Sequence, residues 1–352
     1  MPYPAITPEP DFARLDTVLR GGVPDRVPLF EWYVEHPILL AVREAPFSED
    51  LGMRWRELAE VWRGLGYDYL PASVEIPLPA DTLTAESARG DHNARQWVPS
   101  SHGVIETWED FDRYPWPAPE DVGYYAIEHA AAALPEGMKV VGKVGGAVFG
   151  NALRIMGFAP LCYAVADAPD LFAAVCTRIG EVQVAVVQAL ASHDAVGAIA
   201  VGGDMGYKSQ TIIAPDVLRA HVLPWLQRFA EEAHARGKPL ALHSCGNLAA
   251  IMEDLVTWVG IDGKHSFEDA ITPVTEAKCR WGDRVALLGG IDTDLLARGS
   301  PEQVRARTRE VLEGCMPGGG FALGSGCSIT DYVPLPNYLA MIEEGFRLGV
   351  YA

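Results

Sequence analysis

The sequence predicts an α/β fold, a closed (β/α)₈ barrel, from two observations. Eight short apolar runs follow one another along the 352-residue chain, and the segments between them have the pattern of helices. Such alternation indicates parallel strands covered by helices. The competing open, doubly wound sheet usually carries a G-x-G-x-x-G turn after an early strand, and this chain has none. Eight strand-helix units therefore favour the closed barrel.

The eight runs define the expected strands, and helices are expected between them at 54–66, 169–193, 215–237 and 301–315. The last three helices open on Pro followed by an acidic residue, as helix starts prefer. Residues 74–119 are rich in Pro, Trp and turn residues, so we expect one domain over 1–352 with an insertion there, after the second strand. The expected strands are 26–32, 67–73, 139–148, 195–204, 239–245, 260–267, 285–292 and 320–327.

The charge of the chain restricts its partners. Lys and Arg total 28 against 47 Asp and Glu, and the net charge of −19 argues against nucleic acid or an anionic membrane surface. The chain has no apolar run of about 18 residues and no basic, apolar N-terminus, so we expect neither a membrane span nor a signal peptide. A cytoplasmic enzyme with a small-molecule substrate is the expectation. The oligomeric state stays open, and a homo-oligomer is compatible with the sequence.

The six cysteines are dispersed through the chain, which in a reducing compartment favours thiols or metal ligands over disulfides. Cys162, Cys176 and Cys279 lie in helical patterns and Cys315 lies at a helix end. We expect these four to serve packing. Cys245 and Cys327 instead follow apolar runs that read as strands.

Enzymes with a (β/α)₈ barrel carry their chemistry at the carboxyl ends of the strands. Polar side chains finish most of the expected strands of this chain, and these residues form one candidate list. They are Glu31, His36, Ser73, Glu75, Asp204, Tyr207, His243, Cys245, His265, Glu268, Asp292 and Cys327.

His243 and Cys245 are two residues apart on an expected strand, so both side chains can point to the barrel mouth. Cys327 ends another expected strand within "GSGCSI", where the glycines allow close backbone approach. One imidazole and two thiolates suit a zinc ion and leave its fourth position open. The alternative is packing, because free cysteines are commonly buried and a lone histidine is often a hydrogen-bonded core residue.

Asp204 follows a buried strand and precedes a Gly-flanked segment, so we expect it to act as general base, substrate acceptor or metal neighbour. A structural or helix-capping aspartate is the alternative. Glu31, His36, Tyr207, His265 and Glu268 are expected to contact the substrate. Glu268 can equally cap the following helix, and Glu31 and His36 flank a Trp-Tyr pair that can form a pocket wall.

The segments "VLRGGVPDRVPLFEW", "GGDMGYKSQTIIAP", "LHSCGNL" and "LGSGCSITDYVPLPNY" resemble the uroporphyrinogen decarboxylase superfamily, over almost the full chain. The resemblance is to its methyltransferase branch, whose members adopt a (β/α)₈ barrel. That branch binds zinc through an H-x-C pair and a later Cys in a Gly-rich strand end. His243, Cys245 and Cys327 match these positions, and the resemblance implies a zinc site.

The chain departs from the decarboxylases of this superfamily at two motifs. Their R-Q-A-G-R segment, which holds the porphyrinogen propionates, is replaced by "EWYVEHP", and Cys327 stands where their G-H-G element has histidine. Their pyrrole-binding aspartate matches Asp204. Without the arginines, the resemblance implies methyl transfer in preference to decarboxylation of a tetra-anionic porphyrinogen.

The favoured hypothesis is therefore a zinc-dependent methyltransferase that moves a methyl group between a corrinoid (cobalamin) and a small thiol or methylated substrate. The chain has no D-x-H-x-x-G corrinoid-binding signature, so a separate corrinoid protein or free cobalamin is expected as partner. The first alternative is a decarboxylase-type enzyme that acts without metal on another acid. The second is a non-catalytic ligand-binding barrel with a structural zinc.

Overall fold

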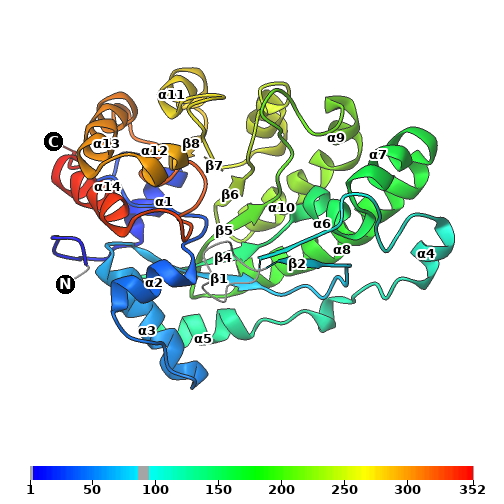
Figure 1. Cartoon of the computed structure of the whole chain (residues 1–352), viewed down its shortest axis with the longest axis horizontal. Helices are drawn as coiled ribbons and strands as arrows, with labels where there is room; N and C mark the ends of the chain where they lie inside the picture. Colours follow the sequence, from blue (N-terminus) through cyan, green and yellow to red (C-terminus); the bar gives the residue numbers. More distant parts are fainter. Residues whose placement is uncertain (1–2, 86–94, 352) are drawn as a thin grey trace.

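The computed structural model describes residues 3–85 and 95–351. Its centre is a curled parallel sheet whose strands are neighbours in chain order, while a separate antiparallel pair of strands lies outside it (Figure 1). The strands of the sheet are β1 (Tyr69–Val74), β4 (Lys139–Val144), β5 (Val196–Gly202), β6 (Leu240–His243), β7 (Gly263–His265), β8 (Ala286–Leu288) and β9 (Phe321–Ala322).

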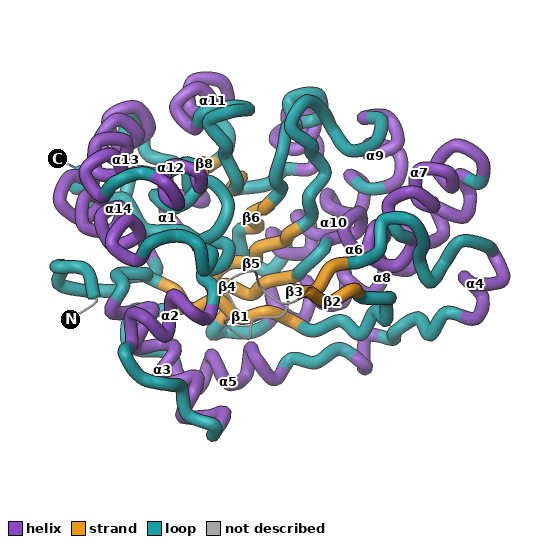
Figure 2. Tube along the Cα trace, in the orientation of Figure 1, coloured by secondary structure: helices purple, strands orange, loops and turns teal. Residues whose placement is uncertain are grey.

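Helices cover the outside of the sheet, and loops leave the strand ends (Figure 2). Strands β6, β7 and β8 are buried along their whole length, which is why they read as continuous apolar runs rather than alternating ones. The helices are α1 (Ala13–Leu19), α2 (His36–Arg43), α3 (Leu51–Gly64), α4 (Trp108–Arg113), η1 (Pro119–Asp121), α5 (Tyr125–Ala133), α6 (Ala147–Met156), α7 (Phe158–Asp167), α8 (Pro169–Ser192), α9 (Pro215–His221), α10 (Leu223–His234), η2 (Asp254–Val259), α11 (Val274–Trp281), α12 (Thr293–Arg298), α13 (Pro301–Cys315) and α14 (Leu335–Leu348).

Seven of the eight expected strands are confirmed, and the continuous strand expected at 26–32 is wrong. That segment makes one parallel bridge to the β9 side, Leu29 with Leu323, and its start pairs instead with the C-terminal segment near Val350. Pro28 has no N–H to offer a ladder. On the other side the hydroxyl of Tyr69 in β1 accepts from the N–H of Glu31 at 2.9 Å and donates to its carbonyl at 2.8 Å. A side chain thus joins this segment to β1.

Several strands end earlier than the sequence suggests. Strand β4 stops at Val144 because Gly146, with φ of 78°, turns the chain into α6. Strands β6 and β9 stop at His243 and Ala322, so Cys245 and Cys327 lie in the loops that follow and not on the strands. The single helix expected at 215–237 is two helices, α9 and α10.

The segment of the expected insertion contains the antiparallel pair β2 (Leu83–Ala85) and β3 (Arg95–Trp97), followed by α4. The backbone N–H groups of Val104 and Ile105 donate to the carbonyl of Ile155 in α6, which ties the segment to the barrel helices. Residues 86–94 lie outside the described residues. An insertion over 74–119 stays a prediction.

Among the described residues, no single helix is long and apolar enough to cross a membrane. Helices α6 and α7 are long and apolar enough only when taken together, and they are bent by 104° relative to each other. Most of α6 is buried against α8. The four cysteines expected in helices, Cys162, Cys176, Cys279 and Cys315, lie in α7, α8, α11 and α13.

Candidate metal centre

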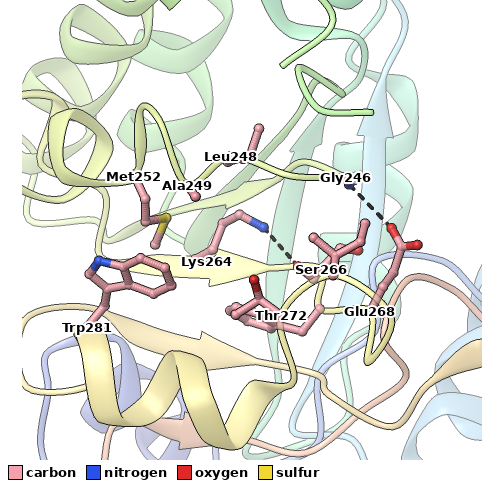
Figure 3. Close-up of a pocket in the computed structure, with 11 residues that line it drawn as sticks. Gly246, Leu248, Ala249, Met252, Lys264, Ser266, Glu268, Thr272 and Trp281 are labelled. Carbon is pink, nitrogen blue, oxygen red and sulfur yellow. Dashed lines mark hydrogen bonds between the residues drawn. The ribbon is translucent and has the colours of Figure 1, made fainter. Parts of the chain in front are cut away.

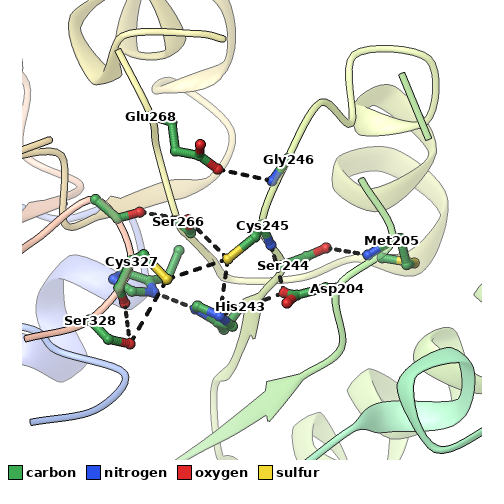
Figure 4. A network of polar contacts seen from close by, with 12 residues as sticks. Asp204, Met205, His243, Ser244, Cys245, Gly246, Ser266, Glu268, Cys327 and Ser328 are labelled. Carbon is green, nitrogen blue, oxygen red and sulfur yellow. Dashed lines mark hydrogen bonds and ion pairs between the residues drawn. The ribbon is translucent and has the colours of Figure 1, made fainter. Parts of the chain in front are cut away.

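The structure brings His243, Cys245 and Cys327 together at the carboxyl edge of the sheet (Figure 4). Their donor atoms all lie within 4.8 Å of one another. The two sulfurs are 3.5 Å apart, and the Cys245 sulfur lies 3.6 Å from Nε2 of His243. A tetrahedral zinc ion with ordinary bond lengths needs about 3.8 Å between two sulfurs and about 3.6 Å between sulfur and nitrogen. The atom types suit zinc, and the two distances from the Cys245 sulfur match the spacing of a tetrahedral site.

Glycines let the loops that carry the thiols approach their neighbours. A Cβ on Gly246, whose φ is 81°, would lie 2.3 Å from the backbone of Gly206 in the loop after β5. A Cβ on Gly324 would lie 1.8 Å from the carbonyl oxygen of Phe30. The expectation that glycines around Cys327 permit close backbone approach is confirmed, and both thiols depend on such contacts for their positions.

His243 is held on two sides. Its ring stacks on the indole of Trp32, with centroids 4.8 Å apart and planes 10° apart. Its Nδ1 lies 2.7 Å from Nδ1 of the fully buried His265. Burial lowers the pKa of His243 well below 6.5 and the pKa of His265 to about 3, so both rings are neutral at neutral pH.

The contact between two neutral rings needs one proton, and its position decides which atom of His243 can bind a metal. If the Nδ1–H of His243 donates to His265, Nε2 of His243 keeps its lone pair and faces the sulfurs. This is the tautomer that a metal requires, and a partner on the far nitrogen is the usual way to fix it.

The sulfurs of Cys245 and Cys327 lie within hydrogen-bonding distance of each other, and either thiol can be the donor. This contact raises the pKa of Cys245 and lowers the pKa of Cys327. The hydroxyl of Ser266 lies 3.6 Å from the Cys245 sulfur and donates to the carbonyl of Gly326. Binding of a metal by both sulfurs would displace the protons of both thiols.

Lys264 in β7 is buried beneath this centre and was missed in the sequence. Its ammonium donates to the carbonyls of Ser244, His265 and Ser266 at 2.8 to 3.0 Å, which joins the ends of β6 and β7. Figure 3 shows Lys264 beside Ser266. Burial lowers the pKa of Lys264 to about 8. A lysine within the apolar run "GIDGKHSF" is the sequence signal that could have found it.

Asp204 and Glu268 both reach the cysteine loop. Asp204 accepts a hydrogen bond from the backbone N–H of Cys245 at 2.8 Å, and the same oxygen lies 3.7 Å from Nε2 of His243. Its side chain is 54% exposed, so it also faces the mouth. Glu268 accepts from the N–H of Gly246 at 3.3 Å. The two carboxylates therefore hold the Cys245 loop from both sides, since Asp204 follows β5 and Glu268 follows β7, the two strands beside β6.

The structure does not bring the other expected substrate residues into this cluster. Glu31 is buried and accepts hydrogen bonds from the N–H and hydroxyl of Ser325. His36 is exposed at the start of α2, where its ring contacts Phe47. The Tyr207 side chain is 68% exposed. Substrate binding by these three residues and by His265 and Glu268 stays a prediction.

The fold and the three-donor centre define a barrel-like α/β protein with a candidate metal site at the strand ends. The family model for uroporphyrinogen decarboxylase (URO-D) matches residues 60–345. The chain therefore belongs to the uroporphyrinogen decarboxylase family, and the family resemblance seen in the sequence is confirmed.

Individual relatives in this family carry two different activities. A methylated-thiol–coenzyme M methyltransferase of Methanosarcina mazei is 31% identical over 136 residues, which are 38% of this chain and 34% of that protein. The chain thus spans about a third of the length of that relative. A uroporphyrinogen decarboxylase of Coxiella burnetii is 24% identical over 284 residues, 75% of this chain and 74% of the relative.

Among solved structures, a methyltransferase from Methanosarcina mazei is similar to this chain with a TM-score of 0.75. The two share 20% sequence identity, and the superposition covers 96% of this chain and 98% of that one. At this identity the similarity establishes the fold and leaves the reaction open.

Proposed function

We propose that this protein is a zinc-dependent methyltransferase that moves a methyl group between a corrinoid and a small thiol or methylated substrate. The observation that carries the proposal is the cluster of His243, Cys245 and Cys327, whose donor atoms lie within 4.8 Å of one another and would leave a fourth zinc position for a ligand. The similarity to a methylated-thiol–coenzyme M methyltransferase supports the same chemistry.

Zinc held by His243, Cys245 and Cys327 would supply a Lewis acid for a thiolate, or for the leaving heteroatom of a methylated donor. A corrinoid would supply or accept the methyl group: in transfer to a thiol, the S–CH₃ bond would replace the bond from methyl to the corrinoid, which would keep the bonding electron pair. The thiol proton needs an acceptor. Asp204 is the residue we assign to that role, because its carboxylate is exposed at the mouth and 3.7 Å from the His243 donor atom.

The corrinoid is proposed to come from a separate protein or from free cobalamin at the open side of the centre. The chain's own contribution is to hold both sulfurs and the imidazole in place before the partner arrives. Asp204 fixes the Cys245 backbone, Glu268 fixes Gly246, and Lys264 fixes the strand ends. Such preorganisation removes an ordering cost from the reaction.

The first test is the metal content of the purified chain and of two variants. We expect about one zinc per chain in the wild type and loss of zinc in Cys245→Ser and Cys327→Ser, because two thiolates supply most of the charge that offsets Zn²⁺. Cys279→Ser is the matched control, since Cys279 is exposed on α11. A folded wild type without zinc after zinc-replete expression would contradict the proposal.

The second test is catalytic. Cob(I)alamin and methylcob(III)alamin differ in visible absorbance, so thiols and methylated donors can be screened in both directions. We expect a change in absorbance for at least one partner and its loss in both cysteine variants. Release of carbon dioxide from uroporphyrinogen with no cobalamin change would favour the decarboxylase alternative.

A further inference from the structure

A cavity of about 270 Å³ lies beside the candidate metal centre, between the sheet and helices α3 and α5. Aromatic rings form much of its wall, with Trp32, Tyr33, Trp55, Trp62 and Tyr125 all lining it. Trp32 also stacks on His243, so one indole contacts both the cavity and the metal centre. This volume is small for a ligand pocket, and it suits a molecule with about one ring.

The cavity contains a buried cation that lacks an anion. Lys143 on β4 lines it, with only 8% of the residue exposed. Its ammonium donates to the carbonyl of Trp32 at 2.6 Å and lies 4.4 Å from the centroid of the same indole. Among the residues that the structure describes, no carboxylate forms an ion pair with it, and burial alone lowers its pKa to about 8. An unpaired buried charge is costly, so retention of this lysine calls for a partner.

One carboxylate belongs to the residues that line this cavity, and it forms no ion pair with Lys143. Glu75 lines the same cavity from its exposed rim, and its side chain accepts a hydrogen bond from the hydroxyl of Tyr125 at 2.6 Å. Within the described residues the Lys143 ammonium donates to one acceptor, the Trp32 carbonyl, and it has further N–H groups to donate.

We propose that this cavity binds a small aromatic acid, with its carboxylate paired to the Lys143 ammonium and its ring packed against the aromatic wall. A charge-assisted hydrogen bond to a buried ammonium supplies the anchor, and offset or edge-to-face ring contacts supply the selectivity for a planar body. A cationic ligand such as a methylated ammonium would meet the Lys143 charge over the Trp32 face, which disfavours it.

This inference rests on the proposed function in one respect: it makes the cavity the anchor for the methylated substrate of the neighbouring metal centre. Trp32 is the physical connection, because it contacts the cavity, Lys143 and His243. Binding of the acid itself needs no metal. The two proposals can therefore fail separately.

The test is isothermal titration calorimetry of the purified chain with benzoate, benzyl alcohol, benzylammonium and glycine betaine, with and without EDTA. We expect benzoate to bind more tightly than the other three, with EDTA making no difference. Lys143→Met should weaken benzoate binding at least tenfold, the scale of one hydrogen bond to a charged group. Lys139→Met is the matched control, because Lys139 is exposed at the other end of β4, and it should leave binding unchanged.

A second variant keeps the test decisive if Lys143→Met fails to fold. Trp55→Leu changes a partly exposed wall residue and keeps the lysine, so it should weaken benzoate binding without abolishing folding. Absence of heat with benzoate, equal binding by Lys143→Met, or tighter binding of glycine betaine or benzylammonium would each overturn the assignment. Loss of benzoate binding only after EDTA treatment would move the acid to the metal and also overturn it.

Discussion

The contact between His243 and His265 leads to a sharp prediction about metal affinity. His265→Leu removes the acceptor 2.7 Å from Nδ1 of His243 while it keeps a side chain of similar size in a fully buried position. The Nδ1–H of His243 then has no partner, and a shift of that proton to Nε2 would remove the lone pair that faces the sulfurs. Partners of this kind are worth about 10- to 100-fold in metal affinity, or about 1.4 to 2.7 kcal/mol.

His265→Asn is the matched variant, because the amide oxygen of Asn can occupy the place of the imidazole Nδ1 and accept the same hydrogen bond. Zinc affinity, measured by competition with a chromogenic chelator, should fall 10- to 100-fold in the Leu variant and only a few-fold in the Asn variant. Thermal unfolding in the presence of EDTA controls for loss of stability. Wild-type zinc affinity in His265→Leu would refute the reasoning.

Three further predictions concern the seam between β1 and residues 26–32, the buried Glu31, and Asp204 at the exposed side of the candidate metal site. Tyr69→Phe leaves the N–H and carbonyl of Glu31 without their partner, so the free energy of unfolding in urea should fall by about 2 kcal/mol; an unchanged value would show that the seam does not depend on this hydroxyl. Burial raises the pKa of Glu31 to about 8, so the folded state holds its proton more tightly than the unfolded state, whose pKa is near 4.5. The stability advantage of the wild type over Glu31→Gln should therefore fall from about pH 5 to pH 8 in EDTA, and a rise would contradict the assigned protonation. The Asp204→Asn variant should retain zinc and lose methyltransferase turnover. Full turnover in this variant would contradict a role for Asp204 as proton acceptor and would favour a structural role.

The sheet was predictable because its strands are buried on both faces. Strands β5, β6 and β8 appear in the sequence as short apolar runs between helical segments, and parallel strands must read this way. The segment 26–32 has the same apolar appearance, yet it makes only single bridges. Apolar content reports burial, and the hydrogen-bond ladder depends on Pro28 and on competition from the C-terminal segment, which the local pattern does not contain.

The gathering of His243, Cys245 and Cys327 was predictable for a related reason. The rule that chemistry gathers at the carboxyl ends of parallel strands places residues far apart in sequence on one edge, and it brought Cys327 to Cys245 correctly. The rule does not say which side chains turn inward beneath that edge. Glu31 follows an expected strand just as Asp204 does, yet it turns into the core toward Ser325.

The residues that the sequence did not reveal are those that support others. In the sequence, Lys264 interrupts an apolar run. Its structural role depends on three carbonyls that accept its hydrogen bonds, and these come together only where the ends of β6 and β7 pair. Trp32 reads as part of an aromatic pair, and its position becomes informative only because His243 and Lys143 both contact the same indole. Donor atoms can be found by residue type and spacing, whereas supporting residues are defined by contacts between strands. In this protein those contacts place His265 beside Nδ1 of His243, hold the Cys245 loop and put a buried ammonium in the neighbouring cavity.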